Sequence, residues 1–390
     1  MRNVVIAGVG MTPFARRPGT GIRALANAAS AEALKDAGVS ADDVEIVYFG
    51  NAVAGTVTGQ DMIRGQVAFR HSDLAGHPVI NVENACASGS SAFHLAVHAV
   101  SGGQYDVALA VGAEQLTHAD KTRPFRALRG STDVFEIGEA GEDEDWTRSI
   151  LMEFYAQEAR AFLTRSDATV EDFARVAVKN RMHARLNPLA QFSAEQTIEE
   201  VLRSRMVVDP LTLPMCSPTT DGSAAVVVCS EQYARDRSIG SLLRVRGCEL
   251  KGGKDTLPVT EATAAVYRSA GIGVDEADVI ELHDAAAPAE LIQYAEIGLC
   301  AEGEEAGLIR DGSTAIGGRI PVNTSGGLMS RGHALGATGI AQLAELAVQL
   351  RGRAGERQVE NARVGLAVNT GGWMGGGYAV AVGTVLEALQ

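Results

Sequence analysis

A single cysteine stands where an apolar, β-rich run gives way to a helix-like pattern. Cys86 lies in the stretch NACASGSSAFHLAVHAV, residues 84–100. A thiol at that junction would lie near unpaired backbone N–H groups and the positive end of a helix dipole, which lower a thiol pKa and favour the nucleophilic thiolate. The alternative is structural, because free cysteine is among the most commonly buried residue types. Position alone favours that alternative.

One histidine stands where a strand-like run ends, and another stands on a glycine-rich loop at the start of a helix. His283 and Asp284 follow the apolar run ADVIEL, and His333 lies in the glycine-rich stretch GGLMSRGHALGATG, residues 326–339, which leads into a helix-like pattern. A neutral imidazole can exchange a proton near neutral pH or donate a hydrogen bond to an oxyanion. A histidine at a strand end is a structural group with all its hydrogen bonds made about as often as it is a functional one. A glycine-rich loop alone is weak evidence for a ligand site.

A second glycine-rich stretch lies near the C-terminus. The sequence VNTGGWMGGGYAVAVG, residues 368–383, predicts a strand, a loop and another strand, with five glycines in the seven positions 371–377. Backbone amides in such a loop can approach a ligand carbonyl, which makes the loop a candidate oxyanion hole. The alternative is a hairpin that is merely rich in glycine.

The composition excludes several classes of protein. The chain has 390 residues and a formal net charge of −14, so it offers no basic field to nucleic acid or to an anionic membrane. No stretch reaches the roughly 18 to 20 apolar residues of a membrane span. Five cysteines without CxxC spacing argue against disulfides and a zinc site, and we expect a soluble cytoplasmic protein with no metal.

An internal repeat organises the chain. Residues 35–52 resemble residues 268–285, because each stretch has a helix end, Ala-Gly, an acidic turn and a strand. Residues 88–115 likewise resemble the helix 335–352 and the strand that follows it. Apolar strands that alternate with Ala-rich helices indicate a layered α/β fold, and duplication predicts that equivalent loops face a shared region.

The repeat predicts three parts. Residues 1–116, together with about 218–248, form the first half, and residues 249–390 form the second. Residues 117–217 form an insertion with no counterpart in the second half, and we expect this insertion to lie over the functional edge of the sheet and shape a substrate channel.

The motifs resemble those of one family when they are taken in order. NACASGSSA, the His-Asp-Ala of residues 283–285, GHALGATG and the glycine-rich hairpin resemble the thiolase superfamily over essentially the whole chain. Because classical thiolases carry Asn-Glu-Ala where this chain has His-Asp-Ala, the sequence is most similar to the branch of sterol-carrier-protein-linked and archaeal thiolases. The resemblance implies the thiolase fold: a duplicated, layered α-β-α-β-α core with an inserted loop domain.

The resemblance also implies roles for individual residues. Cys86 would take an acyl group from a coenzyme A thioester, His333 would accept the thiol proton, and His283 would hold the enolate oxygen of the second acyl-CoA. The backbone N–H groups of Cys86 and of a glycine near Gly376 would form the other oxyanion hole.

Further implications concern ligands and assembly. Ser217 and Met152 stand where thiolases line the pantetheine and acyl channel. The family works on acyl-CoA and CoA without a bound cofactor, and we expect a homodimer or a dimer of dimers, paired through the strand beside the nucleophile helix.

Two departures from the family pattern leave the reaction open. Ala334 replaces a proline, and the second catalytic cysteine is missing, because the hairpin reads NTGGWMGGG and the alternative position is Ala285. The remaining Cys-His-His set resembles that of ketoacyl synthases.

We therefore expect a thiolase-type acyltransferase that cleaves or forms a 3-oxoacyl-CoA. One alternative is an enzyme that transfers the acyl group to a non-CoA or malonyl-type nucleophile, or that acts only beside a small zinc-ribbon and oligonucleotide-fold partner. The other is a non-catalytic acyl-CoA or sterol-CoA binding subunit.

Overall fold

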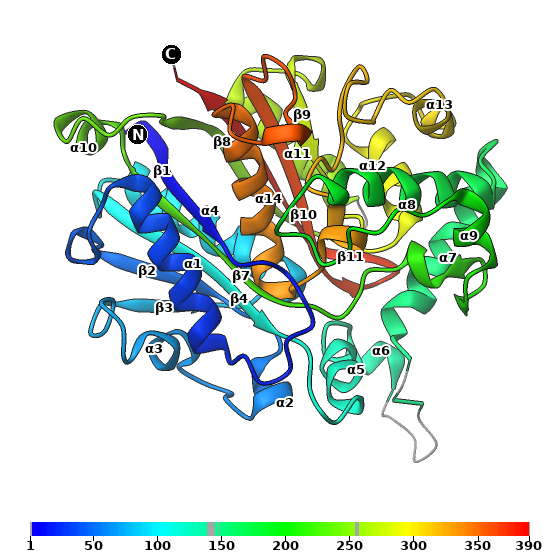
Figure 1. The fold of residues 1–390 in the computed structure, drawn as a ribbon, viewed down its shortest axis with the longest axis horizontal. Coiled ribbons are helices and arrows are strands. Elements are labelled where there is room, and N and C mark those ends of the chain that lie inside the picture. Colours follow the sequence, from blue (N-terminus) through cyan, green and yellow to red (C-terminus); the bar gives the residue numbers. More distant parts are fainter. Residues whose placement is uncertain (1, 139–144, 147, 254–256, 390) are drawn as a thin grey trace.

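The computed structural model describes residues 2–138, 145–146, 148–253 and 257–389. Its main feature is a nine-stranded mixed sheet with the order β3-β2-β4-β7-β1-β8-β11-β10-β9 (Figure 1). The strands are β1 Val4–Met11, β2 Ile46–Gly50, β3 Val79–Val82, β4 Val107–Gln115, β7 Asp221–Ser230, β8 Leu243–Gly252, β9 Val279–Glu281, β10 Val364–Met374 and β11 Gly377–Ala388. A separate two-stranded ladder joins β5 Met206–Val208 and β6 Leu211–Thr212.

The sheet consists of two equivalent halves, which confirms the duplication. Starting from the centre, β1, β7, β4 and β2 of the first half correspond to β8, β11, β10 and β9 of the second. Both units end α1 (Ile22–Ala37) and α11 (Pro258–Ala270) on a left-handed glycine, followed by one 3₁₀ turn and a strand. The halves join where β1 pairs with β8 through Val5 and Ile6.

Helices form three layers around these two half-sheets. Helix α1 packs on the outer face of the first half, and α11 and α12 (Ala287–Glu296) cover the outer face of the second. Between the halves lie α4 (Ser88–Ser101) and α14 (Leu335–Leu350), whose apolar side chains share one core with strands of both halves. The order of layers is therefore the predicted α-β-α-β-α.

Other helices connect or extend these layers. The short ones outside the insertion are α2 Ala54–Thr58, α3 Arg64–Phe69, α10 Glu231–Asp236 and α13 Glu305–Arg310. The insertion contributes α5 Thr122–Arg129, α6 Val134–Ile137, α7 Ile150–Arg165, α8 Val170–Arg185 and α9 Ile198–Arg203. Single 3₁₀ turns lie at Ala41–Asp43, Ala85–Ala87, Leu213–Met215, Val274–Glu276 and Gly355–Arg357, and a π-helical turn lies at Gly327–Arg331.

Glycines let the two central helices approach each other at their N-terminal ends. A Cβ added at Gly89 would lie 2.5 Å from the carbonyl oxygen of Gly336, and one added at Gly112 would lie 2.2 Å from the same atom. Real Cβ atoms do not tolerate such distances, so larger residues would push α14 away from α4 and β4. This close packing holds the starts of α4 and α14 side by side.

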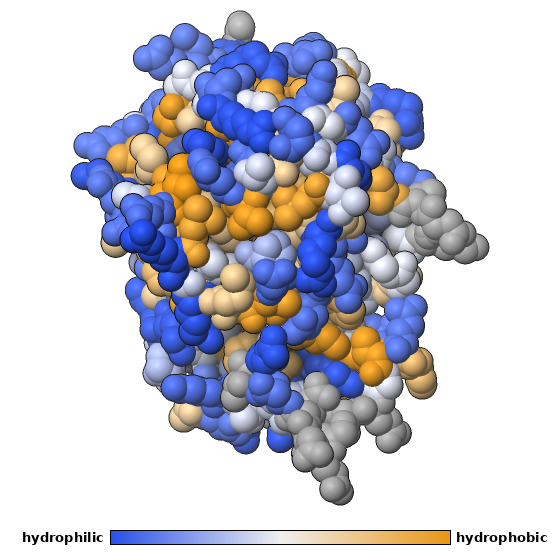
Figure 2. Space-filling model, turned by 90° about the vertical axis from the view of Figure 1, so that its right-hand side faces the viewer, coloured by the Kyte–Doolittle hydropathy of each residue, from blue (hydrophilic) through white to orange (hydrophobic). Residues whose placement is uncertain are grey.

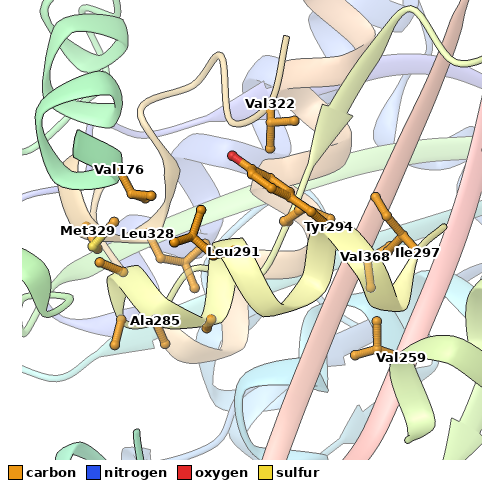
Figure 3. Close-up of a cluster of buried hydrophobic side chains, with 14 of the residues drawn as sticks. Val176, Val259, Ala285, Leu291, Tyr294, Ile297, Val322, Leu328, Met329 and Val368 are labelled. Atoms are coloured by element: carbon orange, nitrogen blue, oxygen red, sulfur yellow. The ribbon is translucent and has the colours of Figure 1, made fainter. Parts of the chain in front are cut away.

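Helix α12 ties the insertion to the second half. Figure 3 shows Leu291 and Tyr294 of α12 among Val176 of α8, Leu328 of the π-helical turn and Val368 of β10. All five side chains are fully buried. The loop that leads into α12, which carries His283, is therefore fixed by packing from both sides.

The insertion begins after β4 and returns through β7, which pairs antiparallel with both β1 and β4. Residues 139–144 and 147 of the insertion lie outside the described residues. The predicted boundary at residue 248 falls within β8, which pairs along most of its length with β11, so the division into domains stays a prediction.

Figure 2 looks onto the side of the molecule where α7, α8, α9 and α13 lie, and hydrophobic patches interrupt its polar surface. The exposed apolar side chains of this region include Met182, Leu202 and Met206. Along the part of the chain that the structure describes, none of the helices has the length and apolar character needed to span a bilayer.

Candidate active site

Cys86 and His333 meet between the starts of the two central helices. Cys86 lies in the single turn Ala85–Ala87 that precedes α4, and His333 lies two residues before α14. The His333 Nε2 atom is 3.2 Å from the Cys86 Sγ atom, and both residues are only 6% exposed. The duplicated fold thus brings together residues that are 247 positions apart in the chain.

Hydrogen bonds determine which nitrogen of His333 carries the proton. Its Nδ1 atom lies 2.8 Å from the Thr338 hydroxyl oxygen, and that hydroxyl donates to the Ala334 carbonyl at 3.1 Å. Because the hydroxyl proton is already used, Nδ1–H is the donor to Thr338, and Nε2 presents a lone pair to the thiol. The backbone N–H of His333 also donates to the Thr220 hydroxyl at 3.0 Å.

The thiol is held in its protonated form, contrary to the sequence-based expectation. Burial raises the pKa of Cys86 to about 12, and the nearby carboxyl of Glu114 acts in the same direction. Burial and the positive charge of Arg331 lower the pKa of His333 to about 3. Desolvation outweighs the helix-terminus effect, so the pair is a neutral thiol and a neutral imidazole. His333 must therefore remove the proton as Cys86 attacks.

His283 has the opposite tautomer. Its Nδ1 atom lies 2.9 Å from the Asn369 amide nitrogen, and the Asn369 carbonyl oxygen accepts a 2.7 Å bond from the Ser90 hydroxyl. Because the amide nitrogen can only donate, Nδ1 is unprotonated and Nε2 carries the hydrogen. Burial, first, and then His333 and Arg331 lower the pKa of His283, so the ring is a neutral hydrogen-bond donor.

The two rings therefore have complementary chemical properties. Their centroids are 5.2 Å apart and their planes are nearly perpendicular. His333 presents a base to Cys86, while His283 presents an N–H group to the same region. This is the arrangement needed to create a sulfur nucleophile and to hold a nearby oxyanion.

One cysteine and two histidines can also bind a metal ion. Ligand-type atoms of Cys86, His283 and His333 lie within 4.8 Å of one another, and within the described ranges this is the only such group of three. Its members come from distant segments, so sequence spacing does not reveal it. The Asn369 bond places a hydrogen on the His283 Nε2 atom, which would have to be lost on coordination. The expectation of no metal stays a prediction.

Asp284 supports the site without facing the thiol. Its carboxylate accepts bonds from the Asn180 amide at 2.9 Å and from the Leu328 backbone N–H at 2.7 Å. A Cβ added at Gly327 would lie 2.2 Å from this carboxylate. Burial, and then the charge of Glu290, raise the pKa of Asp284. Asp284 therefore anchors the π-helical turn that leads to His333.

The glycine-rich hairpin meets the cysteine loop at a different position from the predicted one. Gly376 lies in the exposed turn between β10 and β11, where an added Cβ would meet no atom within 4 Å. A Cβ added at Gly371 would lie 2.2 Å from the Asn84 carbonyl oxygen and 2.7 Å from the Ala87 nitrogen. The backbone beside Cys86 is therefore that of Gly371 and its neighbour, because the strand runs on past the cysteine before it turns.

Ser217 and Met152 come from different segments, one beside the loop that carries His283 and the other in the apolar core at the start of α7. The Ser217 backbone N–H donates to the Ala285 carbonyl at 2.9 Å, which places Ser217 beside the loop that carries His283. Met152 is 8% exposed in the first turn of α7 and packs in the same apolar cluster as Tyr155. Their contact with pantetheine or an acyl chain stays a prediction.

Sequence reasoning missed an aromatic group next to the histidines. The ring of Tyr378 lies edge-on to His283, with centroids 6.2 Å apart, and 5.3 Å from Trp373. Tyr155 packs against both of these residues, and Phe154 stacks on Trp373 at 5.5 Å. The tryptophan and tyrosine stand in or just after the glycine run, but no local pattern signals that they contact α7.

Comparison with known proteins agrees with this geometry. Residues 4–232 match the family model "Thiolase, N-terminal domain", and residues 254–384 match "Thiolase C-terminal domain-like". The chain belongs to the thiolase superfamily. The predicted family is thereby confirmed, and so is its branch, because the curated relatives include archaeal and sterol-carrier-type members of the superfamily.

Three relatives illustrate this branch of the thiolases. The benzoylsuccinyl-CoA thiolase subunit BbsB of Thauera aromatica is 38% identical over 384 residues, which cover 95% of each chain. An acetyl-CoA acetyltransferase of Methanothermobacter thermautotrophicus is 36% identical, with 97% of this chain and 99% of the relative covered. Sterol carrier protein 2 of Gallus gallus is also 36% identical, and the match covers 97% of this chain and 71% of that protein.

Two solved structures resemble this thiolase-family chain over nearly its whole length. One is titled "Ltp2-ChsH2(DUF35) aldolase" and has a TM-score of 0.79 at 26% identity, with 99% of this chain and 98% of the other covered. Human mitochondrial 3-ketoacyl-CoA thiolase has a TM-score of 0.75 at 17% identity, with coverage of 100% and 99%, and shows the shared fold.

Proposed function

We propose that this thiolase-family protein is an acyltransferase that forms an acyl-Cys86 intermediate and cleaves or forms a 3-oxoacyl-CoA. The observation that carries the proposal is the pair of opposite tautomers around one thiol. His333 aims a lone pair at Cys86 over 3.2 Å, and Asn369 leaves the Nε2–H of His283 free to donate.

Cleavage begins when Cys86 attacks the 3-oxo carbonyl of a 3-oxoacyl-CoA. His333 removes the thiol proton as the sulfur–carbon bond forms, which overcomes the raised pKa of the buried thiol. Backbone N–H groups of Cys86 and of the hairpin near Gly371 are the donors proposed for the resulting oxyanion.

The second stage is the loss of the fragment that carries the original thioester, which leaves as the enolate of an acyl-CoA while the shortened acyl group stays on Cys86. The carbon–carbon bond breaks, its electron pair stays on the leaving acyl-CoA, and the enolate oxygen takes the hydrogen bond from the His283 Nε2 atom. Coenzyme A then accepts the acyl group from Cys86. The two substrates of cleavage are a CoA thioester and coenzyme A itself, and the scheme needs no bound cofactor.

Trapping the intermediate tests this proposal. We expect mass spectrometry after incubation with acetyl-CoA to find one acetyl group on Cys86, and thiolysis of acetoacetyl-CoA to depend on that residue. Cys86→Ala should lose both activities. Cys300→Ala is the matched control, since Cys300 is a half-buried cysteine in the turn that follows α12 and lies outside the site. If acetoacetyl-CoA is cleaved equally fast without Cys86, the proposal is wrong.

A second candidate is acyl transfer or carbon–carbon cleavage that works only beside a partner subunit. Two observations favour this candidate: the second catalytic cysteine of the family is missing from its usual positions, and the structure is similar to the Ltp2-ChsH2(DUF35) aldolase. The partner would be a small protein with a zinc ribbon and an oligonucleotide-binding fold. Acylation of Cys86 without thiolysis, followed by activity when such a partner is added, would favour this candidate over the first.

A non-catalytic acyl-CoA binding subunit is the third candidate. A binding protein has no need for a base directed at a buried thiol or for a fixed imidazole tautomer. If acetyl-CoA binds but leaves Cys86 unmodified, both alone and with the partner, the binding role is favoured over catalysis.

A further inference from the structure

The proposed reaction contains a proton transfer for which this chain has no second thiol. The enolate that leaves must gain a proton on carbon, and in the synthetic direction the same carbon must lose one. Neither the hairpin nor Ala285 supplies a thiol. His333 is occupied by the Cys86 proton, and His283 already donates through Nε2. A further acid–base group is therefore required.

Two phenols border the region where that proton must move. The ring of Tyr378 meets the ring of His283 nearly perpendicularly, with centroids 6.2 Å apart. Tyr155 lies 6.3 Å from Tyr378 between ring centroids and is 5% exposed. Its hydroxyl is close enough to Cys86 and Asp284 to interact with them electrostatically.

The position of Tyr378 matches the carbon that exchanges its proton. The enolate oxygen is held by His283, and the reacting carbon is the carbonyl carbon's neighbour, only two bonds from that oxygen. A phenol packed against the His283 ring is therefore the group that we infer to reach this carbon. Tyr378 is half-buried and presents a phenol, one of the side chains that enzymes use as general acids and bases.

We propose that the hydroxyl of Tyr378, with the phenol of Tyr155 packed beside it, replaces the missing cysteine as the group that moves the α-proton. This assignment rests on the proposed acyl transfer at Cys86. In cleavage, the Tyr378 O–H bond breaks and a C–H bond forms on the enolate carbon, which leaves a phenolate and a neutral acyl-CoA.

The second substrate then converts the phenolate back to the phenol. The thiol of coenzyme A gives its proton to Tyr378, and the resulting thiolate attacks acyl-Cys86. The Cys86 sulfur that leaves recovers its proton from His333. No oxidant or reductant is needed: the net proton transfer is from the coenzyme A thiol to the enolate carbon, and Tyr378, His333 and Cys86 each end in their starting protonation state.

The environment of the phenols agrees with this cycle. Burial raises the pKa of both Tyr378 and Tyr155, so each is protonated at neutral pH and able to donate to a carbanion. The neighbouring hydroxyl of Tyr155 acts in the opposite direction on the pKa of Tyr378 and so favours its phenolate. Tyr155 is therefore a positioning residue for Tyr378.

Exchange of the acetyl protons of acetyl-CoA with deuterated water isolates this step. We expect Tyr378→Phe to slow exchange by about 100-fold or more, within the usual range for loss of an acid–base group, while acetylation of Cys86 changes less than about threefold. Tyr155→Phe should slow exchange by about tenfold. Tyr267→Phe is the matched control, because it removes a phenol that donates to the Ile297 carbonyl away from the site.

The Cys86→Ala variant separates this inference from the proposed function. This variant should lose acetylation at position 86 but should still exchange the acetyl protons of acetyl-CoA through Tyr378. The Tyr378→Phe variant should show the opposite result, with acetylation kept and proton exchange lost. Exchange at the wild-type rate in Tyr378→Phe overturns the assignment, as does loss of exchange in Tyr155→Phe alone. Failure of acetylation in a wild-type enzyme that still exchanges protons contradicts only the proposed acyl transfer.

Should Tyr378→Phe fail to fold, fluorotyrosine at position 378 provides the test. A fluorinated phenol is more acidic, so the pH dependence of exchange should move to lower pH. An unchanged profile overturns the role of Tyr378.

Discussion

The Nε2 atom of His333 lies 3.2 Å from the Sγ atom of Cys86, between the N-terminal ends of two helices that occupy equivalent places in a duplicated fold. Neither group is charged, because burial raises the pKa of the thiol and lowers that of the imidazole. The geometry therefore favours a thiol activated at the moment of attack over a preformed thiolate.

Replacement of His333 should expose this dependence. We expect His333→Ala to slow acetylation of Cys86 by about 10²- to 10⁴-fold, because His333 is the base that the described residues present to the thiol. Time-resolved mass spectrometry measures the rate. His71→Ala, at an exposed position outside the site, is the control and should leave the rate unchanged. Equal rates in the His333 variant and the wild type would rule out its role as the base.

The protonation state of Cys86 can be measured by alkylation. With a pKa near 12, the thiol is almost fully protonated at pH 7, so labelling by iodoacetamide should be slow and should rise steadily up to at least pH 10. Peptide mapping separates Cys86 from the other cysteines. A labelling rate that levels off below pH 8 would show a thiolate and contradict the neutral pair.

Asn369 should control the tautomer of His283. Asn369→Asp replaces the amide donor with a carboxylate acceptor, which would draw the proton to Nδ1 and turn a lone pair toward the oxyanion. We expect thiolysis to fall by about 10²- to 10³-fold, the scale for loss of an oxyanion donor. Asn369→Ala, which leaves the tautomer free, should fall less. A smaller loss in the aspartate variant than in the alanine variant would contradict the mechanism.

Buried histidines should make the fold sensitive to acid. Burial lowers the pKa of His183 and of His333 to about 3, below the value of 6.5 for an exposed histidine, and also lowers that of His283. Between pH 6.5 and 3 the unfolded chain binds protons that the folded chain does not, so stability falls as the pH falls.

Each such histidine contributes a slope of about 1.4 kcal/mol per pH unit well inside that window. Urea unfolding between pH 7.5 and 5 measures the slope. His183→Asn should reduce it, whatever its effect on absolute stability. A slope that is identical in this variant would show that His183 is not the cause.

In the homodimer that we expect, two chains pair through the edge strand β3. This strand pairs only with β2 among the described residues, and Ile80 on it is 45% exposed. An unpaired strand edge with an exposed apolar side chain is a site for pairing with a second chain. We expect light scattering to give twice 40.7 kDa for the wild type and a shift toward the monomer for Ile80→Arg. If the variant has the same mass as the wild type, the dimer interface does not lie at β3.

The sequence alone determined the architecture and the principal reacting groups. The two copies of the α/β unit follow local rules of hydrophobic period, acidic turns and glycine at helix ends, so residues 35–52 and 268–285 could be matched without a structure. Once the repeat was recognised, it placed Cys86 and His333 at equivalent helix starts. The family comparison bears out the fold, and the roles of these residues stay predictions.

The tertiary structure decided what state these groups are in and which neighbours they have. The raised pKa of Cys86 depends on burial by the whole fold, and the tautomers depend on Thr338 and Asn369, which no spacing connects to the histidines as partners. The approach of Gly371 and the position of Tyr378 are set by the register of a hairpin against a distant loop. Local sequence patterns encode helices, strands and turns, whereas desolvation and hydrogen-bond partners arise only when segments far apart in the chain pack together.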